Sequence, residues 1–264
     1  MNDATMTSKK TVALRTLLFL VACPAILIAA GPLTKTVSSL RGQLLVGIVT
    51  SFFTFVLTFV FVRWDGLQLR DVGTAVSVHT VPQLFIGFVI GSALVALQIV
   101  VVCAGAHTHW VVAPHQRFGV TLLALVGYFA LALREEFAFR GYPLRRLESA
   151  WGTWVALLLI AVVFTLEHTA GGWSWSRSLL GPPAGALLFG MAALSTRGIV
   201  VPLGIHTAFN FGQWFMGQKE IAGLLRPVVD AGFDHQADTL SYVGYLAGML
   251  LAASGFWLWR KHRA

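Results

Sequence analysis

The sequence is dominated by apolar runs long enough to cross a lipid bilayer. A helix needs about 20 mostly apolar residues to span roughly 30 Å of hydrocarbon. Eight segments approach that length: Leu14 to Ala30, Leu44 to Val62, Leu84 to Ala104, Phe118 to Leu133 with a helical continuation, Trp154 to Thr169, Leu179 to Ser195, Ile199 to Met216, and Tyr242 to Trp259. The sequence therefore predicts an all-α fold, a polytopic transmembrane helical bundle with about eight spans.

Composition excludes a water-soluble globule. Hydrophobic residues make up 56% of the 264 residues and charged residues only 11%, which leaves too little polar surface to cover such a chain in water. We therefore expect an integral membrane protein. We expect its location to be a bacterial-type cell membrane. No polar stretch is long enough to build a separate soluble core.

The positive charge of the chain indicates topology, not nucleic-acid binding. The formal net charge is +8, but the basic residues stand singly or in pairs between apolar runs. An N-terminus in the cytoplasm puts most of the 19 lysines and arginines on or near that side, so we expect both termini to be cytoplasmic. The first run also has the flanks of a signal peptide, but it is long for one, and we favour an uncleaved span.

Two boundaries are marked by breaker residues. Pro182 and Pro183 are expected to kink or start the sixth run. Only Thr196, Arg197 and Gly198 separate the sixth run from the seventh, which predicts a tight helical hairpin.

Ionisable residues cluster in the fourth predicted span. An ionisable side chain inside a bilayer costs several kcal/mol unless it is paired or hydrated, so each one suggests a function. Glu136 and Arg140 are four residues apart, share a helix face and can neutralise each other. Glu135 is rotated by about 100° from Glu136 and is free to face another helix. We therefore expect Glu136 to be structural and Glu135 to be chemical.

The fifth and seventh spans carry matching polar groups. His168 ends the fifth run, and His206 and Asn210 lie four residues apart in the seventh, where they can donate hydrogen bonds to one oxygen. Measured from the shared turn at 1.5 Å per residue, Glu135 and His168 lie at depths of ~18 and ~22 Å. His206 and Asn210 lie at ~12 and ~18 Å from the same side. The four groups are expected to converge.

Each feature taken alone has an ordinary structural explanation. A single histidine or asparagine in a span more often joins helices by a hydrogen bond, and a Glu/Arg pair at four-residue spacing is usually structural. Arg134 and Glu167 are explained equally well by snorkelling, by pairing or by support of a site. Glu135 has no explanation within its own helix, so the three sets together favour a functional site.

In this order, the motifs resemble those of the CPBP family of membrane proteins. That family, also called Abi, includes CAAX prenyl endopeptidases and bacteriocin-processing or immunity proteins. The matching motifs are Glu-Glu-x-x-x-Arg at Glu135, Glu136 and Arg140, Phe-x-x-x-His at Phe164 and His168, and His-x-x-x-Asn at His206 and Asn210. The resemblance divides the chain into residues 1–117 with helices 1–3, a CPBP-like catalytic core at 118–216 with helices 4–7, and 217–264 with a loop and helix 8.

The resemblance implies an intramembrane endopeptidase. In such an enzyme Glu135 and His168 would position and deprotonate a water, and His206 and Asn210 would stabilise the oxyanion formed on the peptide carbonyl. Glu136, Arg140 and Phe164 would support them. The implied partners are a peptide or protein substrate, membrane-associated or prenylated, and the lipid bilayer, with no nucleic acid.

Metal dependence stays open at this point. Glu135, His168 and His206 with a water would form a site for a divalent metal such as zinc. The His-Glu-x-x-His signature is absent, however, and asparagine is an uncommon zinc ligand. We favour the metal-free version.

Two other functions place carboxylates and histidines within the membrane. One is a proton-coupled transporter or channel. The other is a non-catalytic immunity or scaffold protein that keeps these residues for stability.

The distribution of lysines and arginines also predicts a depth for the site. With both termini in the cytoplasm, Glu135 and His168 are expected to lie nearer the outer face of the membrane.

Overall fold

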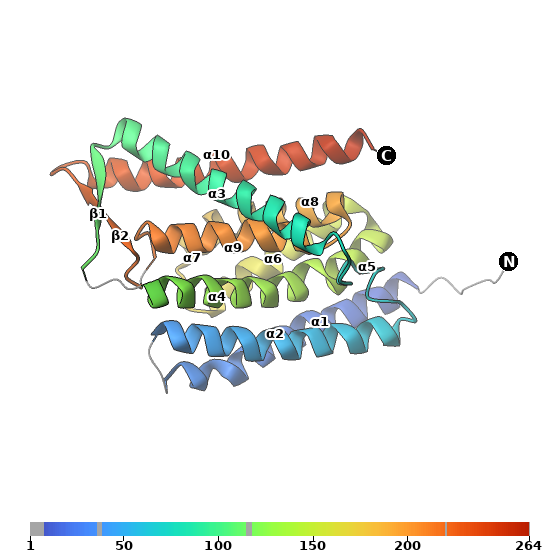
Figure 1. The fold of residues 1–264 in the computed structure, drawn as a ribbon. Helices are drawn as coiled ribbons and strands as arrows, with labels where there is room; N and C mark the ends of the chain where they lie inside the picture. Colours follow the sequence, from blue (N-terminus) through green and yellow to red (C-terminus); the bar gives the residue numbers. More distant parts are fainter. Residues whose placement is uncertain (1–7, 36–38, 115–117, 220, 264) are drawn as a thin grey trace.

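The computed structural model describes residues 8–35, 39–114, 118–219 and 221–263, which form an elongated helical bundle (Figure 1). The α-helices are α1 (Lys9–Ala30), α2 (Ser39–Trp64), α3 (Thr80–Gly105), α4 (Phe118–Glu135), α5 (Tyr142–Trp151), α6 (Thr153–Ala170), α7 (Trp175–Leu180), α8 (Pro182–Thr196), α9 (Val200–Phe215) and α10 (Asp234–Lys261). A 3-10 turn, η1 (Gly31–Lys35), follows α1, and a π-helical turn, η2 (Glu136–Arg140), follows α4. The two strands are β1 (Thr108–Val112) and β2 (Leu225–Val229).

The predicted transmembrane bundle is confirmed. In the described ranges, seven helical segments are long and apolar enough to cross a membrane. The remaining predicted span corresponds to α9, whose 16 residues reach only about 24 Å. The start of α1 and the end of α10 lie at the same end of the bundle (Figure 1), as an even number of crossings requires.

Two of the predicted runs are interrupted. The continuation of the fourth run is not one α-helix, because η2 and a bend at Gly141 separate α4 from α5. The sixth run is split at Gly181 into α7 and α8, and Pro182 begins α8 because proline suits a first helical turn. The predicted hairpin is present, with Arg197 at φ 57° between α8 and α9.

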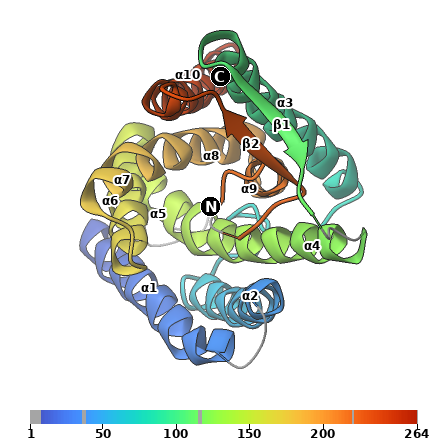
Figure 2. The ribbon, with the colours of Figure 1, turned by 90° about the vertical axis from the view of Figure 1, so that its left-hand side faces the viewer.

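Helix α9 occupies the centre of the bundle and packs closely on α3 (Figure 2). The contact depends on glycine: a Cβ at Gly87 would lie 2.2 Å from the carbonyl oxygen of Val201, and one at Gly204 would lie 2.3 Å from that of Leu84. Small residues of this kind let helix backbones approach in membranes, where packing drives association. The depth of α9 is therefore fixed by α3.

The end opposite the termini carries a small sheet that the sequence did not reveal. Strands β1 and β2 pair antiparallel, from Thr108 opposite Val229 to Val112 opposite Leu225. We expected residues 217–239 to form a loop and the last helix to begin near Tyr242, but β2 lies within that stretch and α10 already begins at Asp234. The sheet lies across this end of the bundle, in front of α9 in the view of Figure 2.

At the end that carries the termini, Asp65 joins three helices. Its carboxylate is fully buried and forms ion pairs with Arg15 of α1 and with Arg146 of α5, the latter at 2.6 Å from Nε. The hydroxyl of Tyr142 donates to Asp65 Oδ2 at 2.9 Å. One carboxylate thus holds α1, the end of α2 and α5 together.

We expect Asp65→Asn to lower the free energy of unfolding by about 3–5 kcal/mol, because it removes the buried counter-charge of the partly buried guanidinium groups of Arg15 and Arg146. The measurement is the unfolding midpoint of the purified chain in detergent. Asp71→Asn is the control: Arg70 lies 3.9 Å from the Asp71 carboxylate on the surface, and such pairs contribute less than about 1 kcal/mol. Equal losses for the two variants would contradict the role of Asp65.

Candidate functional site

The two adjacent glutamates lie where α4 changes into the π-helical turn η2. The amide of Gly141 donates to the carbonyl of Glu136 at 3.0 Å, an i to i+5 bond that widens the helix. Single π turns inside helices occur frequently at functional sites. The turn begins at Glu136, directly after Glu135.

His206 of α9 contacts both glutamates. Its Nδ1 lies 2.9 Å from Glu136 Oε1, and its Nε2 lies 3.7 Å from Glu135 Oε2. The ring stacks on Phe189 of α8 at 4.3 Å between centroids, which fixes its plane. The predicted convergence of Glu135 and His206 is present, while the contact of Glu136 with His206 was not expected.

Arg140 is buried beside Glu136, as its four-residue spacing predicted. Its Nη1 lies 3.7 Å from Glu136 Oε1, and both side chains are fully inaccessible. The guanidinium carbon lies 4.6 Å from the ring centroid of Phe164 and 5.3 Å from that of Phe189. The cation is therefore stabilised by one carboxylate and by aromatic faces.

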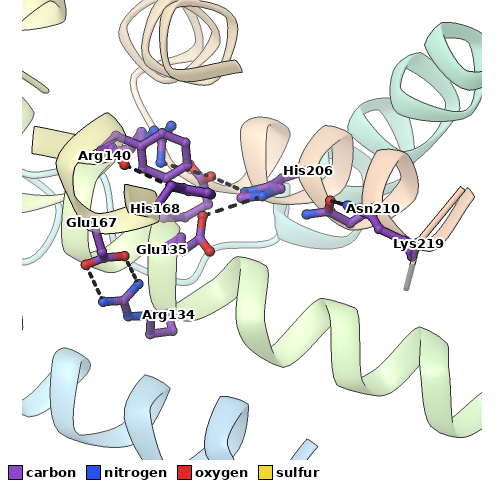
Figure 3. Close-up of polar contacts among 10 residues, drawn as sticks. Arg134, Glu135, Arg140, Glu167, His168, His206, Asn210 and Lys219 are labelled. Atoms are coloured by element: carbon purple, nitrogen blue, oxygen red, sulfur yellow. Dashed lines mark hydrogen bonds and ion pairs between the residues drawn. The ribbon is translucent and has the colours of Figure 1, made fainter. Parts of the chain in front are cut away.

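His168 reaches the same region from the end of α6. Its Nδ1 donates to the carbonyl of Phe164 at 2.9 Å, so the neutral ring presents Nε2 as an acceptor. His168 lies within electrostatic reach of Glu135, and Figure 3 shows the two side chains next to each other. The ring is held between Phe164 and Trp173, at centroid distances of 4.5 and 4.9 Å.

A buried ion pair aligns the helices that carry Glu135 and His168. Arg134 binds Glu167 through two parallel hydrogen bonds, of which Nη2 to Oε2 measures 2.7 Å (Figure 3). Each partner is adjacent in sequence to a candidate catalytic residue. Of the three explanations considered for Arg134 and Glu167, the structure supports pairing, which brings Glu135 and His168 to one level.

Asn210 lies one turn beyond His206 and is turned toward Lys219. The ammonium of Lys219 donates to Asn210 Oδ1 at 2.9 Å (Figure 3). With its oxygen bound, Asn210 keeps its NH2 group as the donor for other partners. Lys219 was missed by the sequence analysis because it follows α9, in a polar connection with no helical spacing to Asn210.

The four candidate catalytic residues line one cavity of about 670 Å³, namely Glu135, His168, His206 and Asn210. Toward the end with β1 and β2, its wall includes Trp173 of the connection after α6 and Lys219 of the connection after α9. The cavity therefore extends from the middle of the bundle to the end opposite the termini.

The side chains of this cavity are not grouped as a three-ligand metal site in the described residues. Across the described residues, no three His, Cys, Asp or Glu side chains are grouped as a metal ion requires. His206 and His168 each use Nδ1 on a protein acceptor, which leaves Nε2 of each ring as the atom that could face a ligand. Catalytic zinc in proteins usually has three protein ligands.

The family resemblance is confirmed by comparison with known proteins. Residues 117–212 match the model of the type II CAAX prenyl endopeptidase Rce1-like family. No curated protein matched the chain. The matched segment runs from the region of α4 into α9 and includes all four candidate catalytic residues.

We expect Glu167→Gln to destabilise the chain by about 3–5 kcal/mol, because it leaves the Arg134 guanidinium buried without a counter-charge. Replacing both partners by apolar residues, as in Arg134→Met with Glu167→Leu, should restore much of that loss. Unfolding in detergent measures both variants, with Asp71→Asn as the exposed control. A double variant as unstable as the single one would contradict this account.

Proposed function

Because residues 117–212 match the type II CAAX prenyl endopeptidase family, we propose that this chain is an intramembrane endopeptidase that hydrolyses a peptide bond in the cavity. The observation that carries the proposal is the position of His206, in contact with Glu135 and Glu136 at the inner part of a cavity of about 670 Å³. The substrate is a peptide or protein at the membrane, with prenylated C-termini as one candidate class.

In the proposed reaction Glu135 is the general base. Its side chain retains partial exposure to the cavity, whereas Glu136 is fully buried. A water bound by Glu135 and by the free Nε2 of His168 would attack the peptide carbonyl carbon while Glu135 accepts its proton. A positioned base of this kind contributes about 10²- to 10⁴-fold to the rate.

His206 and Asn210 are the proposed oxyanion donors. With carboxylates facing both of its ring nitrogens, His206 can donate from Nδ1 to Glu136 and from Nε2 toward the cavity. The Asn210 NH2 group would be the second donor, held by the bond from Lys219 to its oxygen. Removal of one preorganised donor costs about 10²- to 10³-fold in turnover.

The remaining steps return the site to its starting state. The tetrahedral carbon collapses, the C–N bond breaks, and Glu135 returns the proton to the leaving nitrogen. The products are a carboxylic acid and an amine, which in water become a carboxylate and an ammonium group, and one water is consumed. Glu136, Arg140 and Phe164 act through His206 and His168 by fixing their rings.

We propose that the reaction needs no metal ion. The grouping of side chains supports this choice, since no three His, Cys, Asp or Glu side chains of the described residues are arranged as a metal site. Both termini are proposed to be cytoplasmic, which would open the cavity toward the outer face of a bacterial-type cell membrane.

We expect Glu135→Gln to abolish cleavage of a prenylated CAAX reporter peptide by the full chain in nanodiscs, with turnover at least about 10²-fold lower, because Gln cannot accept the proton. Asp234→Asn, a carboxylate at the start of α10, is the control and should keep wild-type activity. If the reporter is not cut, the membrane proteomes of cells with wild-type protein and of cells with the Glu135→Gln variant are compared. Proteins cleaved only in the wild-type membranes are the candidate substrates.

Three outcomes would contradict the proposed function. Cleavage that persists in Glu135→Gln would exclude Glu135 as the general base. Proton flux in liposomes that disappears in Glu135→Gln, without proteolysis, indicates a transporter or channel. A cellular function that survives in both Glu135→Gln and His168→Ala, with folded proteins, indicates a scaffold or immunity role.

For metal dependence, we expect proteolysis to survive dialysis against a strong chelator and to show no gain on addition of zinc. The reason is that no protein ligand set for zinc forms in the described cavity. Activity and bound metal, by elemental analysis, are measured on the same sample. Loss of activity with the metal, and its return on reloading, would contradict the metal-free proposal.

A further inference from the structure

A second hollow, of about 1370 Å³, lies at the end of the bundle that carries the termini. We call it the arginine groove. Its walls come from the turn after α2, from α3, the middle of α5, the α8–α9 hairpin and the last turns of α10. In Figure 1, α3 and α10 are close near β1 and diverge toward this end. None of the four candidate catalytic residues lines the arginine groove.

Positive charge is concentrated in the arginine groove. Its lining contains the arginines Arg70, Arg145, Arg197, Arg260 and Arg263. The acidic residues of the lining are Asp71 and Glu148. Five guanidinium groups against two carboxylates leave a net positive lining, and like charges packed together require a counter-ion or a large cost.

One of the two carboxylates of the lining, that of Glu148, is already shared by two arginines. Glu148 lies 2.6 Å from Nη2 of Arg260 and 3.6 Å from Nη1 of Arg145. Nε of Arg145 and Nη1 of Arg260 are buried yet have no hydrogen-bond partner among the described atoms. Arg197 lies within electrostatic reach of Arg145. Unsatisfied buried donors beside several cations are suited to an anion with more than one oxygen.

Another part of the groove is lined by apolar side chains and is open toward lipid. Ile86 of α3 is 53% exposed, although it lies in a helix apolar enough to span a bilayer. Phe256 and Trp259 of α10 form the opposite wall. Trp259 stacks under Arg263, whose guanidinium lies 4.3 Å from the ring centroid, as expected of side chains at the headgroup level. The groove can therefore hold an anionic headgroup against its arginines and an acyl chain against its apolar wall.

We propose that the arginine groove binds one anionic phospholipid of the surrounding leaflet. The phosphate is held by Arg145, Arg197 and Arg260, and an acyl chain lies between α3 and α10 against Ile86 and Phe256. Basic pockets between transmembrane helices bind anionic lipid headgroups by this combination of charge and burial. The inference does not depend on the peptidase activity, because the groove and the catalytic cavity lie at opposite ends of the bundle.

The test is lipid binding to the purified full chain in detergent, followed by native mass spectrometry. The three probes are phosphatidylglycerol, phosphatidylcholine with the same acyl chains, and glycerol phosphate without chains. We expect phosphatidylglycerol to bind at least tenfold more tightly than phosphatidylcholine. Glycerol phosphate should neither bind at matched concentration nor displace phosphatidylglycerol.

Charge is tested by the double variant Arg197→Gln and Arg263→Gln, which should weaken phosphatidylglycerol binding about 30-fold, the effect of two lost charges near an anionic headgroup. Its control is Lys10→Gln with Arg63→Gln. These two residues lie in the first turn of α1 and the last turn of α2, at the same end of the bundle but outside the groove.

Shape is tested by filling the groove at Gly255 of its lining. A Cβ there would meet no atom within 4 Å, so Gly255→Phe can fold and occupy the space of the acyl chain. We expect it to lower affinity for phosphatidylglycerol at least tenfold. Gly119→Phe, at the start of α4, is the matched control because a Cβ there is equally unobstructed.

Three results would overturn the proposal. Equal affinities for phosphatidylglycerol and phosphatidylcholine would show that the groove does not distinguish headgroups by their charge. Wild-type affinity in both the arginine variant and Gly255→Phe would place the lipid elsewhere. Displacement of the lipid by glycerol phosphate at matched concentration would identify the ligand as a free phosphate instead.

Discussion

The buried contact between Glu136 and His206 is the interaction on which the centre of this bundle depends. Ionised side chains within apolar surroundings cost several kcal/mol unless they are paired. Glu136 is fully buried and is compensated by His206 at 2.9 Å and by Arg140 at 3.7 Å. The pairing joins η2 to α9, and Arg134 with Glu167 joins α4 to α6 in the same way. The groups proposed for chemistry therefore lie among charges that also determine helix packing.

Long apolar runs and helical spacing predicted much of this structure. Run length alone identified the helices that span the bundle, because hydrocarbon thickness sets a minimum length whatever the tertiary contacts. The Glu136–Arg140 pair was also predictable, since both residues lie on one helix. The convergence of Glu135, His168 and His206 required an estimate of depth. The estimate succeeded although η2 and the bend at Gly141 interrupt the fourth run, because the Arg134–Glu167 ion pair keeps α4 and α6 at one level.

Contacts between distant parts of the chain were not predictable. Glu136 was assigned to Arg140 alone because its other partner, His206, is 70 residues away. Lys219 and the two strands lie in polar connections without a helical period. Asp65 was overlooked because a single acid at the end of a span resembles any interfacial residue until α1 and α5 pack against it. The π turn has no signature in a 3.6-residue pattern.

The π turn η2 also determines how the residues of α5 are rotated about the helix axis relative to those of α4. It therefore sets the Asp65 cluster relative to the cavity at Glu135. A π turn holds one residue more than the α-helical path that it replaces. Deleting one residue there would rotate everything that follows by about 100° and shift it by about 1.5 Å. Tyr142 and Arg146 would then face away from Asp65 while Glu135 stayed in place. One inserted residue thus lets a single helical run serve the cavity on one face and an anchoring cluster on another, so length changes in this segment are expected to be tolerated less than substitutions.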